Sequence, residues 1–311
     1  MATRTQPFGT GKRESHDSSD FYARFTTPEL SDDDTVTPCA VADRLVCGDA
    51  RDLSLVDDRC VALVVTSPPY FAGKEYEQGL GEGHVPSSYV DFLRMLRDVF
   101  AECRRVLEPG GRMAVNVANL GRRPYRSLSA DVIGILEDVL GLLLRGEIVW
   151  RKAKGATGSI AVGSYRSASN PVLRDVTERI VVASKGRFDR AISRKERQRQ
   201  GLPHEDTITK GAFFASTLDV WDVRPEHARR VGHPAPFPVE LPERLIHLYT
   251  YRGDVVLDPF LGSGSTAVAA VRAGRRYLGY DTDASYVALA ESRVAEAAAA
   301  GEQPPPEPAD P

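Results

Sequence analysis

Five consecutive apolar residues at positions 61–65 are the feature that most limits how this chain can fold. A half-exposed strand alternates apolar and polar residues, whereas a strand covered on both faces is apolar throughout. Strands of the second kind occur mainly in parallel sheets, because crossover connections place helices on both faces of such a sheet. The run therefore predicts an α/β protein with a buried parallel sheet.

The pattern around this run alternates strand and helix. Apolar residues recur at helical spacing over 89–107, and this pattern stops at Pro109-Gly110-Gly111, which is typical of a helix end. The other elements predicted in this way are helices over 131–144, 241–249 and 266–273, and strands over 113–117, 147–150, 179–183, 255–257 and 276–280. Such an alternation indicates one α/β domain over about 41–296.

Both ends of the chain and one internal segment lack this pattern. Residues 1–40 are polar and rich in Ser, Thr and Asp, and residues 297–311 include a proline run, so we predict that both are mostly disordered. Polar residues without a clear apolar period over about 185–215 indicate an insertion on the surface.

Composition places the chain among ordinary globular proteins. No apolar run reaches the roughly 20 residues that a membrane span needs, and the first residues lack the apolar stretch of a signal peptide. The four cysteines show no CxxC spacing and no His at metal-ligand spacing. We therefore predict no bound metal and a reduced, cytoplasmic setting.

The net charge of −3 conceals a basic segment. Residues 145–235 contain 18 Lys and Arg against 10 Asp and Glu, a balance that would attract a polyanion such as DNA. A basic surface without a partner is the alternative. The candidate DNA-binding residues in the predicted insertion are Arg187, Arg190, Arg194, Lys195, Arg197, Arg199 and Lys210, which would contact phosphates or guanine edges. A second basic loop, from Trp150 to Arg166, also offers an approach to DNA.

A glycine-rich turn joins the strand predicted over 255–257 to the helix predicted over 266–273. Glycines there let the backbone approach a ligand at the carboxyl end of a parallel strand. Asp258, at the strand end, would repel a pyrophosphate but suits a positive amino group such as that of S-adenosylmethionine. Asp281 ends the next strand, where a carboxylate is placed to accept both ribose hydroxyls. The stretch favours a methyl donor over a dinucleotide; taken alone, it also fits a structural strand-to-helix turn.

A proline-rich loop, Thr66-Ser67-Pro68-Pro69-Tyr70, follows directly on the buried strand. Two prolines fix φ and remove two backbone donors, so the loop is stiff and presents carbonyl acceptors. The Ser67 hydroxyl and the Pro68 carbonyl would orient the N–H groups of an amino-bearing base and free its nitrogen lone pair, so that positioning and preorganised dipoles supply the rate. Such a base must be flipped out of the duplex to stack on Tyr70. A strand end without a catalytic role is the alternative.

Several motifs in consistent order resemble the DNA amino-methyltransferases, in the permuted, beta-type arrangement where the catalytic motif precedes the cofactor motif. Ser67-Pro68-Pro69-Tyr70 is similar to the catalytic tetrapeptide of that family, and 258–266 is similar to its methyl-donor motif. The resemblance covers about 43–295. It implies a Rossmann-like fold, with a doubly wound, mainly parallel sheet of seven strands that is circularly permuted and carries its target-recognition insertion at about 185–215.

The same resemblance implies which residues bind S-adenosyl-L-methionine. It places Asp49 near the adenine amino group of the donor, and Phe237 in a motif, 233–238, that completes the methionine side of the pocket. The other implied cofactor-binding residues are Asp258, Pro259, Phe260, Gly262, Ser263, Gly264, Ser265, Thr266 and Asp281. Catalysis is assigned to Ser67, Pro68, Pro69 and Tyr70.

Position 67 bears on the target base. Family members with Ser there mostly modify N4 of cytosine and those with Asp mostly N6 of adenine, so Ser67 favours cytosine N4, with adenine N6 as the alternative. Methylation at carbon 5 of cytosine needs a cysteine nucleophile. Because the one Pro-Cys dipeptide, Pro38-Cys39, lies in the polar N-terminal segment, we exclude that chemistry.

A non-catalytic DNA-binding protein is the alternative from a different class. A protein that only binds DNA needs neither Ser67 nor Asp258, so the presence of both disfavours it. The predicted partners are double-stranded DNA and, as a second candidate, a cognate restriction endonuclease. We also predict a monomer or homodimer in the cytoplasm, associated with the nucleoid.

Overall fold

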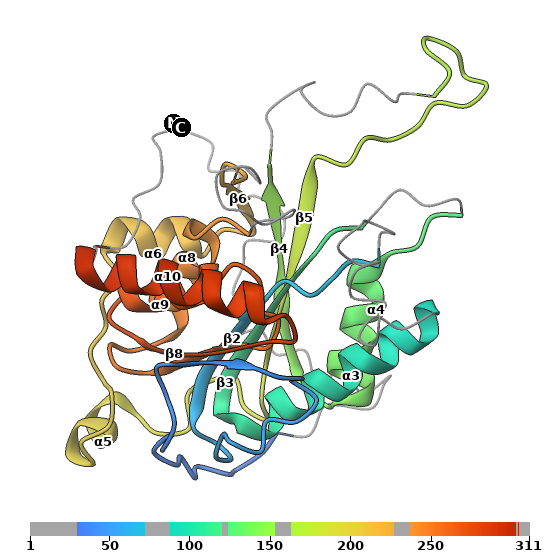
Figure 1. Ribbon diagram of the computed structural model, residues 1–311. Helices are drawn as coiled ribbons and strands as arrows, with labels where there is room; N and C mark the ends of the chain where they lie inside the picture. The colour runs from blue at the N-terminus through green and yellow to red at the C-terminus, as the bar shows by residue number, and fades with distance from the viewer. Residues whose placement is uncertain are drawn as a thin grey trace, which may run out of the picture. The chain divides into compact units, whose positions relative to one another are not determined.

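An eight-stranded sheet carries the fold in the computed structural model (Figure 1), which describes residues 30–71, 88–119, 124–152, 163–226, 237–302 and 304. In the order in which they lie side by side, the strands are β1 (Arg44–Cys47), β8 (Arg276–Asp281), β7 (Val255–Asp258), β2 (Val61–Thr66), β3 (Leu107–Val117), β5 (Thr177–Ser184), β4 (Leu143–Arg151) and β6 (Val220–Asp222). Within these described strands only β5 runs antiparallel to its neighbours, which confirms a mainly parallel sheet. The predicted number of seven strands is wrong, because the short β6 pairs with the outer side of β4.

Helices cover both faces of the sheet (Figure 1). One face carries α3 (Tyr89–Val106), α4 (Leu128–Gly134) and the π-helical turn η1 (Ile135–Val139). The other carries α8 (Glu240–Tyr249) and α9 (Ser265–Arg272), with α6 (Lys210–Ser216) packed on α8 and α10 (Ala284–Ala300) packed on α9. No helix in the described part of the chain is long and apolar enough to cross a membrane.

Strand β2 shows why residues 61–65 are apolar throughout. Val61 and Val64 are buried in the core under α3, whereas Leu63 and Val65 are buried in the core under α8 and α9. Side chains on both faces of this strand are thus removed from water, and the prediction of a buried parallel strand is confirmed.

Two element boundaries differ from the prediction. The helix predicted over 131–144 ends at Val139, and Leu143 already begins β4, because a short apolar run fits a helix or a strand equally well. Pro109-Gly110-Gly111 is part of β3 and not a turn that ends α3. Gly110 has φ +76°, and a Cβ there would lie 1.8 Å from the Asp189 carbonyl oxygen, so this glycine permits close contact with the segment after β5.

The segment after β5 was predicted to be a surface insertion that recognises DNA. The location of its first part corrects this prediction. Gly110 N–H donates to the Lys185 carbonyl and Ala191 N–H to the Pro109 carbonyl, so the chain after β5 packs at the amino-terminal end of β3. Helix α5 (Arg194–Arg199) follows there. In a mainly parallel sheet the ligand site forms at the carboxyl ends of the strands, which is the opposite edge.

Two of the candidate DNA-binding arginines are buried at this edge. Arg197 Nη2 lies 3.0 Å from Asp254 Oδ1, and its Nη1 lies 3.3 Å from Glu108 Oε1. Arg190 Nη1 lies 3.0 Å from Asp254 Oδ2, and Arg190 also pairs with Glu108. The side chains of all four are at most 9% exposed. Assigning Arg190 and Arg197 to DNA is wrong, because two buried carboxylates already neutralise them.

Substituting Arg197 by Ala should destabilise the fold by about 3–5 kcal/mol, because removing one partner leaves buried carboxylates without their counter-charge. Thermal unfolding measures this loss. The matched control is Arg199→Ala, since Arg199 makes an exposed pair with Glu196 and should change stability by less than about 0.5 kcal/mol. Equal melting temperatures for the two variants would contradict the role assigned to Arg197.

The predicted ends of the domain also need correction. Helix α10 runs to Ala300, and Ala297 is buried in the core, so the tail predicted from 297 begins later. At the other end, residues 31–40 are described, and Thr37 N–H donates to the Arg59 carbonyl at 3.0 Å. Residues 1–29, 303 and 305–311, on which the rest of these predictions fall, lie outside the described residues.

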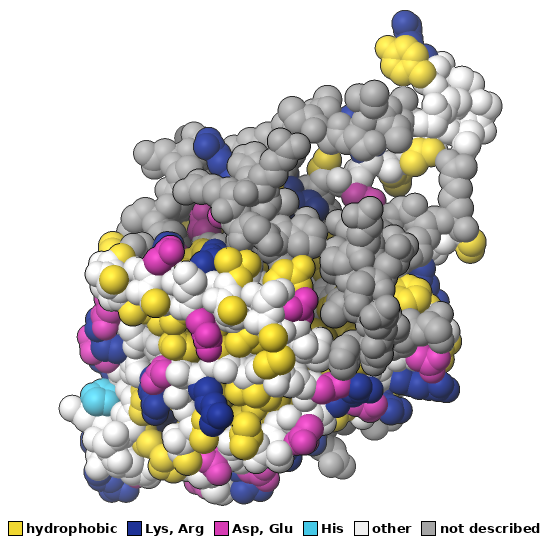
Figure 2. Space-filling view, viewed as in Figure 1, with side chains coloured by type: hydrophobic (Ala, Val, Ile, Leu, Met, Phe, Trp, Pro, Cys, Tyr) yellow, Lys and Arg dark blue, Asp and Glu magenta, His cyan; other side chains and the backbone are white. Residues whose placement is uncertain are grey.

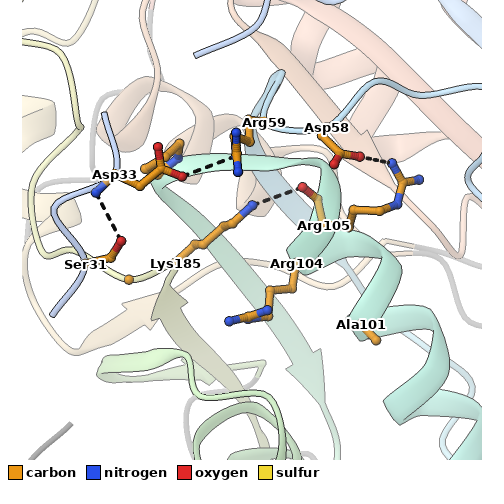
Figure 3. A pocket seen from close by; sticks show the side chains of 10 residues that line it. Ser31, Asp33, Asp58, Arg59, Ala101, Arg104, Arg105 and Lys185 are labelled. Carbon is orange, nitrogen blue, oxygen red and sulfur yellow. Dashed lines mark hydrogen bonds and ion pairs between the residues drawn. The ribbon is translucent and has the colours of Figure 1, made fainter. Parts of the chain in front are cut away.

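A pocket of about 350 Å³ lies between residues 31–33 and the junction of α3 and β3 (Figure 3). Two of its arginines pair with carboxylates of the protein: Arg59 pairs with Asp33, and Arg105 Nη1 lies 2.6 Å from Asp58 Oδ1. Lys185 Nζ donates to the carbonyls of Arg105, at 3.0 Å, and Leu107, at 2.6 Å, where α3 ends. These contacts among the lining residues hold residues 31–33 and α3 against the sheet.

Candidate active site

The proline-rich loop and the glycine-rich turn meet at the carboxyl ends of two neighbouring strands. In the parallel pair β2–β7, Val64 lies beside Leu257, so Thr66 and Asp258 end their strands at the same edge. Thr66 Oγ1 donates to Asp258 Oδ1 at 2.7 Å, and both side chains are buried. Two motifs separated by 192 positions are thus joined by one hydrogen bond.

Asp258 has the electrostatic properties of a cation-binding group. Phe260 N–H also donates to its Oδ1, at 3.1 Å, and the residue is only 4% exposed. Burial raises the pKa of Asp258 to about 6, since few donors replace the water that the carboxylate has lost. A bound ammonium group would supply the positive charge that this buried carboxylate lacks. Asp258 and its surroundings therefore fit the methionine end of S-adenosylmethionine.

The glycine-rich turn is shaped by packing as well as by access for a ligand. Gly264, which precedes α9, has φ +79°, and a Cβ there would lie 2.6 Å from Ala290 Cβ on α10. The turn brings the buried Ser263 and Ser265 to the amino end of α9. Ser265 Oγ is buried and makes no hydrogen bond within the described residues. This hydroxyl could therefore bind the carboxylate of the methionine part of S-adenosylmethionine.

The remaining predicted cofactor residues lie at the ends of adjacent strands or beside them. Asp281 ends β8; its Oδ2 accepts from Gly262 N–H at 2.8 Å, and burial raises the pKa of this carboxyl. Asp49 follows β1, next to β8, and its carboxylate binds Arg51. Phe237 is partly buried against the core under α8; residues 233–236 of its motif lie outside the described residues.

The proline-rich loop is part of a hydrogen-bond network that the sequence did not predict. Ser67 Oγ lies 2.8 Å from Tyr70 Oη, and Tyr70 Oη donates to Glu178 Oε2 at 2.9 Å. Asn116 Nδ2 donates to the same Oε2 at 2.5 Å, and Lys152 Nζ donates to Oε1 at 2.7 Å. The only sequence signal was polar residues inside apolar strands: Asn116 near the end of β3 and Glu178 near the start of β5.

The predicted DNA-binding residues do not gather at this site. Arg187 donates to the Asp33 carbonyl, Arg194 pairs with Asp206 and Arg199 with Glu196, all around the chain that leaves the far edge of the sheet. Lys195 is an exposed residue of α5, and Lys210 begins α6.

A different segment extends from the edge of the sheet where Thr66 and Asp258 lie. Residues 163–176 lead into β5 at the end where Thr177 pairs with Arg151, and they project beyond the sheet (Figure 1). The arm is closed by a bridge between Gly163 and Pro171, and Tyr165 is 78% exposed. Figure 2 shows Lys or Arg and hydrophobic side chains beside each other at the tip of this projection.

Comparison with known proteins agrees with the architecture. A family model described as DNA methylase, named for N6 and N4 methyltransferases, matches residues 61–292. The type II methyltransferase M.MjaI of Methanocaldococcus jannaschii is 27% identical over 281 residues, which cover 81% of this chain and 90% of that protein. The DNA adenine methyltransferase YhdJ of Escherichia coli is also 27% identical, with 81% and 83% of the two chains covered.

Among solved structures, TTHA0409 of Thermus thermophilus in complex with S-adenosyl-L-methionine superposes with a TM-score of 0.62 and 32% identity, covering 82% of this chain and 95% of that one. The fold and site thus define a Rossmann-like methyltransferase. The chain belongs to the N6/N4 DNA methylase family, and S-adenosyl-L-methionine is its methyl donor.

Donor affinity should depend on pH through Asp258. Below pH 6 the free protein holds a proton on Asp258, and this proton must leave before the carboxylate can pair with an ammonium group. We therefore expect affinity to fall about tenfold per pH unit below 6, after allowance for Asp281, whose pKa is also raised. Titration calorimetry of the donor between about pH 5 and 8 measures this. Asp258→Asn should flatten the curve, and an unchanged curve in that variant would contradict the assignment.

Proposed function

We propose that this chain transfers a methyl group from S-adenosyl-L-methionine to the exocyclic N4 of a cytosine flipped out of double-stranded DNA. The observation that carries the proposal is the Thr66–Asp258 hydrogen bond, since it holds a loop suited to an amino group against a turn suited to a methyl donor. A protein that only binds DNA has no need of this contact.

The residues of the loop supply positioning. Ser67 Oγ and the Pro68 carbonyl accept the two hydrogens of the target amino group, which releases the nitrogen lone pair from the ring. Asp258 holds the ammonium group of the donor and Asp281 its ribose hydroxyls, and Asp49 lies beside its adenine. When bound, S-adenosyl-L-methionine supplies a methyl group on a sulfonium, so that no protein nucleophile is required.

For DNA contact we propose the arm 163–176 in place of the segment after β5. The arm leaves the sheet at the catalytic edge, and Arg166 at its tip is exposed. Arginine contacts to phosphate and base edges, together with the exposed ring of Tyr165, suit a groove of DNA beside a flipped base.

Adenine N6 is the second candidate target, because YhdJ, a relative of similar identity, is an adenine methyltransferase. We favour cytosine on Ser67, a neutral hydroxyl in the position where adenine-modifying members mostly carry Asp. The type II methyltransferase among the relatives also suggests a restriction–modification role for this chain, with a cognate endonuclease as partner.

Single-molecule sequencing of DNA from a host that expresses the chain tests the target. We expect N4-methylcytosine in one sequence context, and a much smaller methylated fraction in a host expressing Ser67→Ala. A signal at adenine N6 would favour adenine, the second candidate, over cytosine. Unmodified DNA would contradict the proposed methyl transfer.

A further inference from the structure

We propose that Glu178 is a positioning residue for methyl transfer, which sets the direction of the hydrogen bonds that run from Ser67 through Tyr70. In that direction, Ser67 Oγ presents lone pairs, and not its proton, to the target amino group. The inference rests on the proposed function, since it assigns a role to a residue behind the same catalytic loop.

The surroundings of Glu178 show that its carboxylate organises this part of the site. Its side chain is 8% exposed and lies in β5, between β3 and β4. Three donors from three different elements converge on it: Tyr70 from the loop after β2, Asn116 from β3 and Lys152 from the end of β4. A buried carboxylate without such donors would be strongly unfavourable, so they and Glu178 hold one another in place.

The direction of the network follows from what each group can donate. An ionised carboxylate only accepts hydrogen bonds, so Tyr70 gives its single phenolic proton to Glu178. Tyr70 Oη then acts as an acceptor, from Asn116 Nδ2 at 2.9 Å and from the Ser67 hydroxyl at 2.8 Å. Ser67 has one proton, and it is committed to Tyr70.

This commitment matters for the reaction. Asn116 Nδ2 lies 3.4 Å from Ser67 Oγ, a long contact that leaves the serine oxygen able to accept a second hydrogen. An amino group that donates to this oxygen keeps its own lone pair for the methyl carbon. If Ser67 instead donated to the amino nitrogen, it would occupy the lone pair that must attack.

A neutral amide at position 178 should reverse the direction of these hydrogen bonds. The side chain of the Glu178→Gln variant has one oxygen, and the charged Lys152 is the stronger competitor for it, which turns the amide NH₂ toward Tyr70 and Asn116. Asn116 then has to turn its amide so that Oδ1, which accepts no hydrogen bond within the described residues, faces this NH₂ in place of Nδ2. Tyr70 would then accept from this amide and donate to Ser67, and the Ser67 proton would point at the base. Glu178→Gln keeps the shape of the side chain, so packing changes little.

Single-turnover methylation of duplex DNA tests this with the full chain and S-adenosyl-L-methionine. We expect Glu178→Gln to lower the rate constant of transfer by about 10- to 100-fold, the range for loss of one hydrogen bond to a charged group. The KM for DNA, the affinity for the donor and the melting temperature should stay near those of the wild type. Glu147→Gln, the same change at an exposed position of β4, is the matched control and should transfer at the wild-type rate.

A double-mutant cycle with Tyr70→Phe separates positioning from a general structural effect. Removing the phenolic oxygen cuts the connection between Glu178 and Ser67, so Glu178→Gln should slow the Tyr70→Phe enzyme by less than about threefold. The proposal is overturned if Glu178→Gln transfers at the wild-type rate, if the two effects multiply in full, or if the loss lies in KM or thermal stability alone. Failure of the proposed function would be seen in the wild type itself, which would then modify another base or none.

Discussion

Ser67→Ala should lower the rate constant of methyl transfer by about 10²–10³-fold, which is the usual loss when one preorganised polar group is removed from a reacting centre. Ser67 directly follows Thr66, which bonds to Asp258, and the variant loses the acceptor that orients the amino group. Single-turnover kinetics with labelled donor measure the change.

Two properties should survive in that variant. Donor affinity should stay within about twofold, because Asp258 and Asp281 are untouched, and the melting temperature should hold because Ser67 is only partly buried. If Ser67→Ala methylates DNA at the normal rate, the loop is not the catalytic loop.

Asp258→Ala should have the largest effect on the donor. Removing one member of a buried charge pair costs about 2–5 kcal/mol, so affinity for S-adenosyl-L-methionine should fall by at least about 30-fold. Calorimetry or equilibrium dialysis measures this affinity. At saturating S-adenosyl-L-methionine, the rate of methyl transfer should fall by a smaller factor than the affinity does.

Asp258→Asn provides the control for folding. The amide oxygen can still accept from Thr66 Oγ1, so the contact between β2 and β7 is preserved while the charge is lost. The Asn and Ala variants should therefore weaken donor binding alike and differ in melting temperature. Donor binding at wild-type affinity in the folded Asn variant would contradict a cation-binding role for Asp258.

The parts of the molecule that depend on local pattern could be predicted from the sequence. The apolar run at 61–65 predicts a strand with both faces buried, and the strand–turn–helix at 255–273 matches β7 and α9 within about one residue. The site could be predicted to the extent that its two halves each follow a strand. Carboxyl ends of neighbouring parallel strands meet at one edge, and Thr66 and Asp258 do so.

The parts of the molecule that depend on pairing between distant residues could not be predicted from the sequence. A run of arginines after β5 indicates a basic surface, and nothing local shows that Glu108 and Asp254 will neutralise two of them. Glu178 carries no motif, and its role appears only when β5 lies beside β3 and brings it to Tyr70. Cys39 and Cys60 have no recognisable spacing either, yet their sulfur atoms lie 2.6 Å apart.

Mass spectrometry of nucleosides is the most direct test of the central claim. Purified protein is incubated with duplex DNA and S-adenosyl-L-methionine that carries a deuterated methyl group, and the DNA is digested to nucleosides. We predict label in N4-methyldeoxycytidine, and its loss with Ser67→Ala. Label in 5-methyldeoxycytidine, or no label in any nucleoside across a varied set of DNA sequences, would contradict the account.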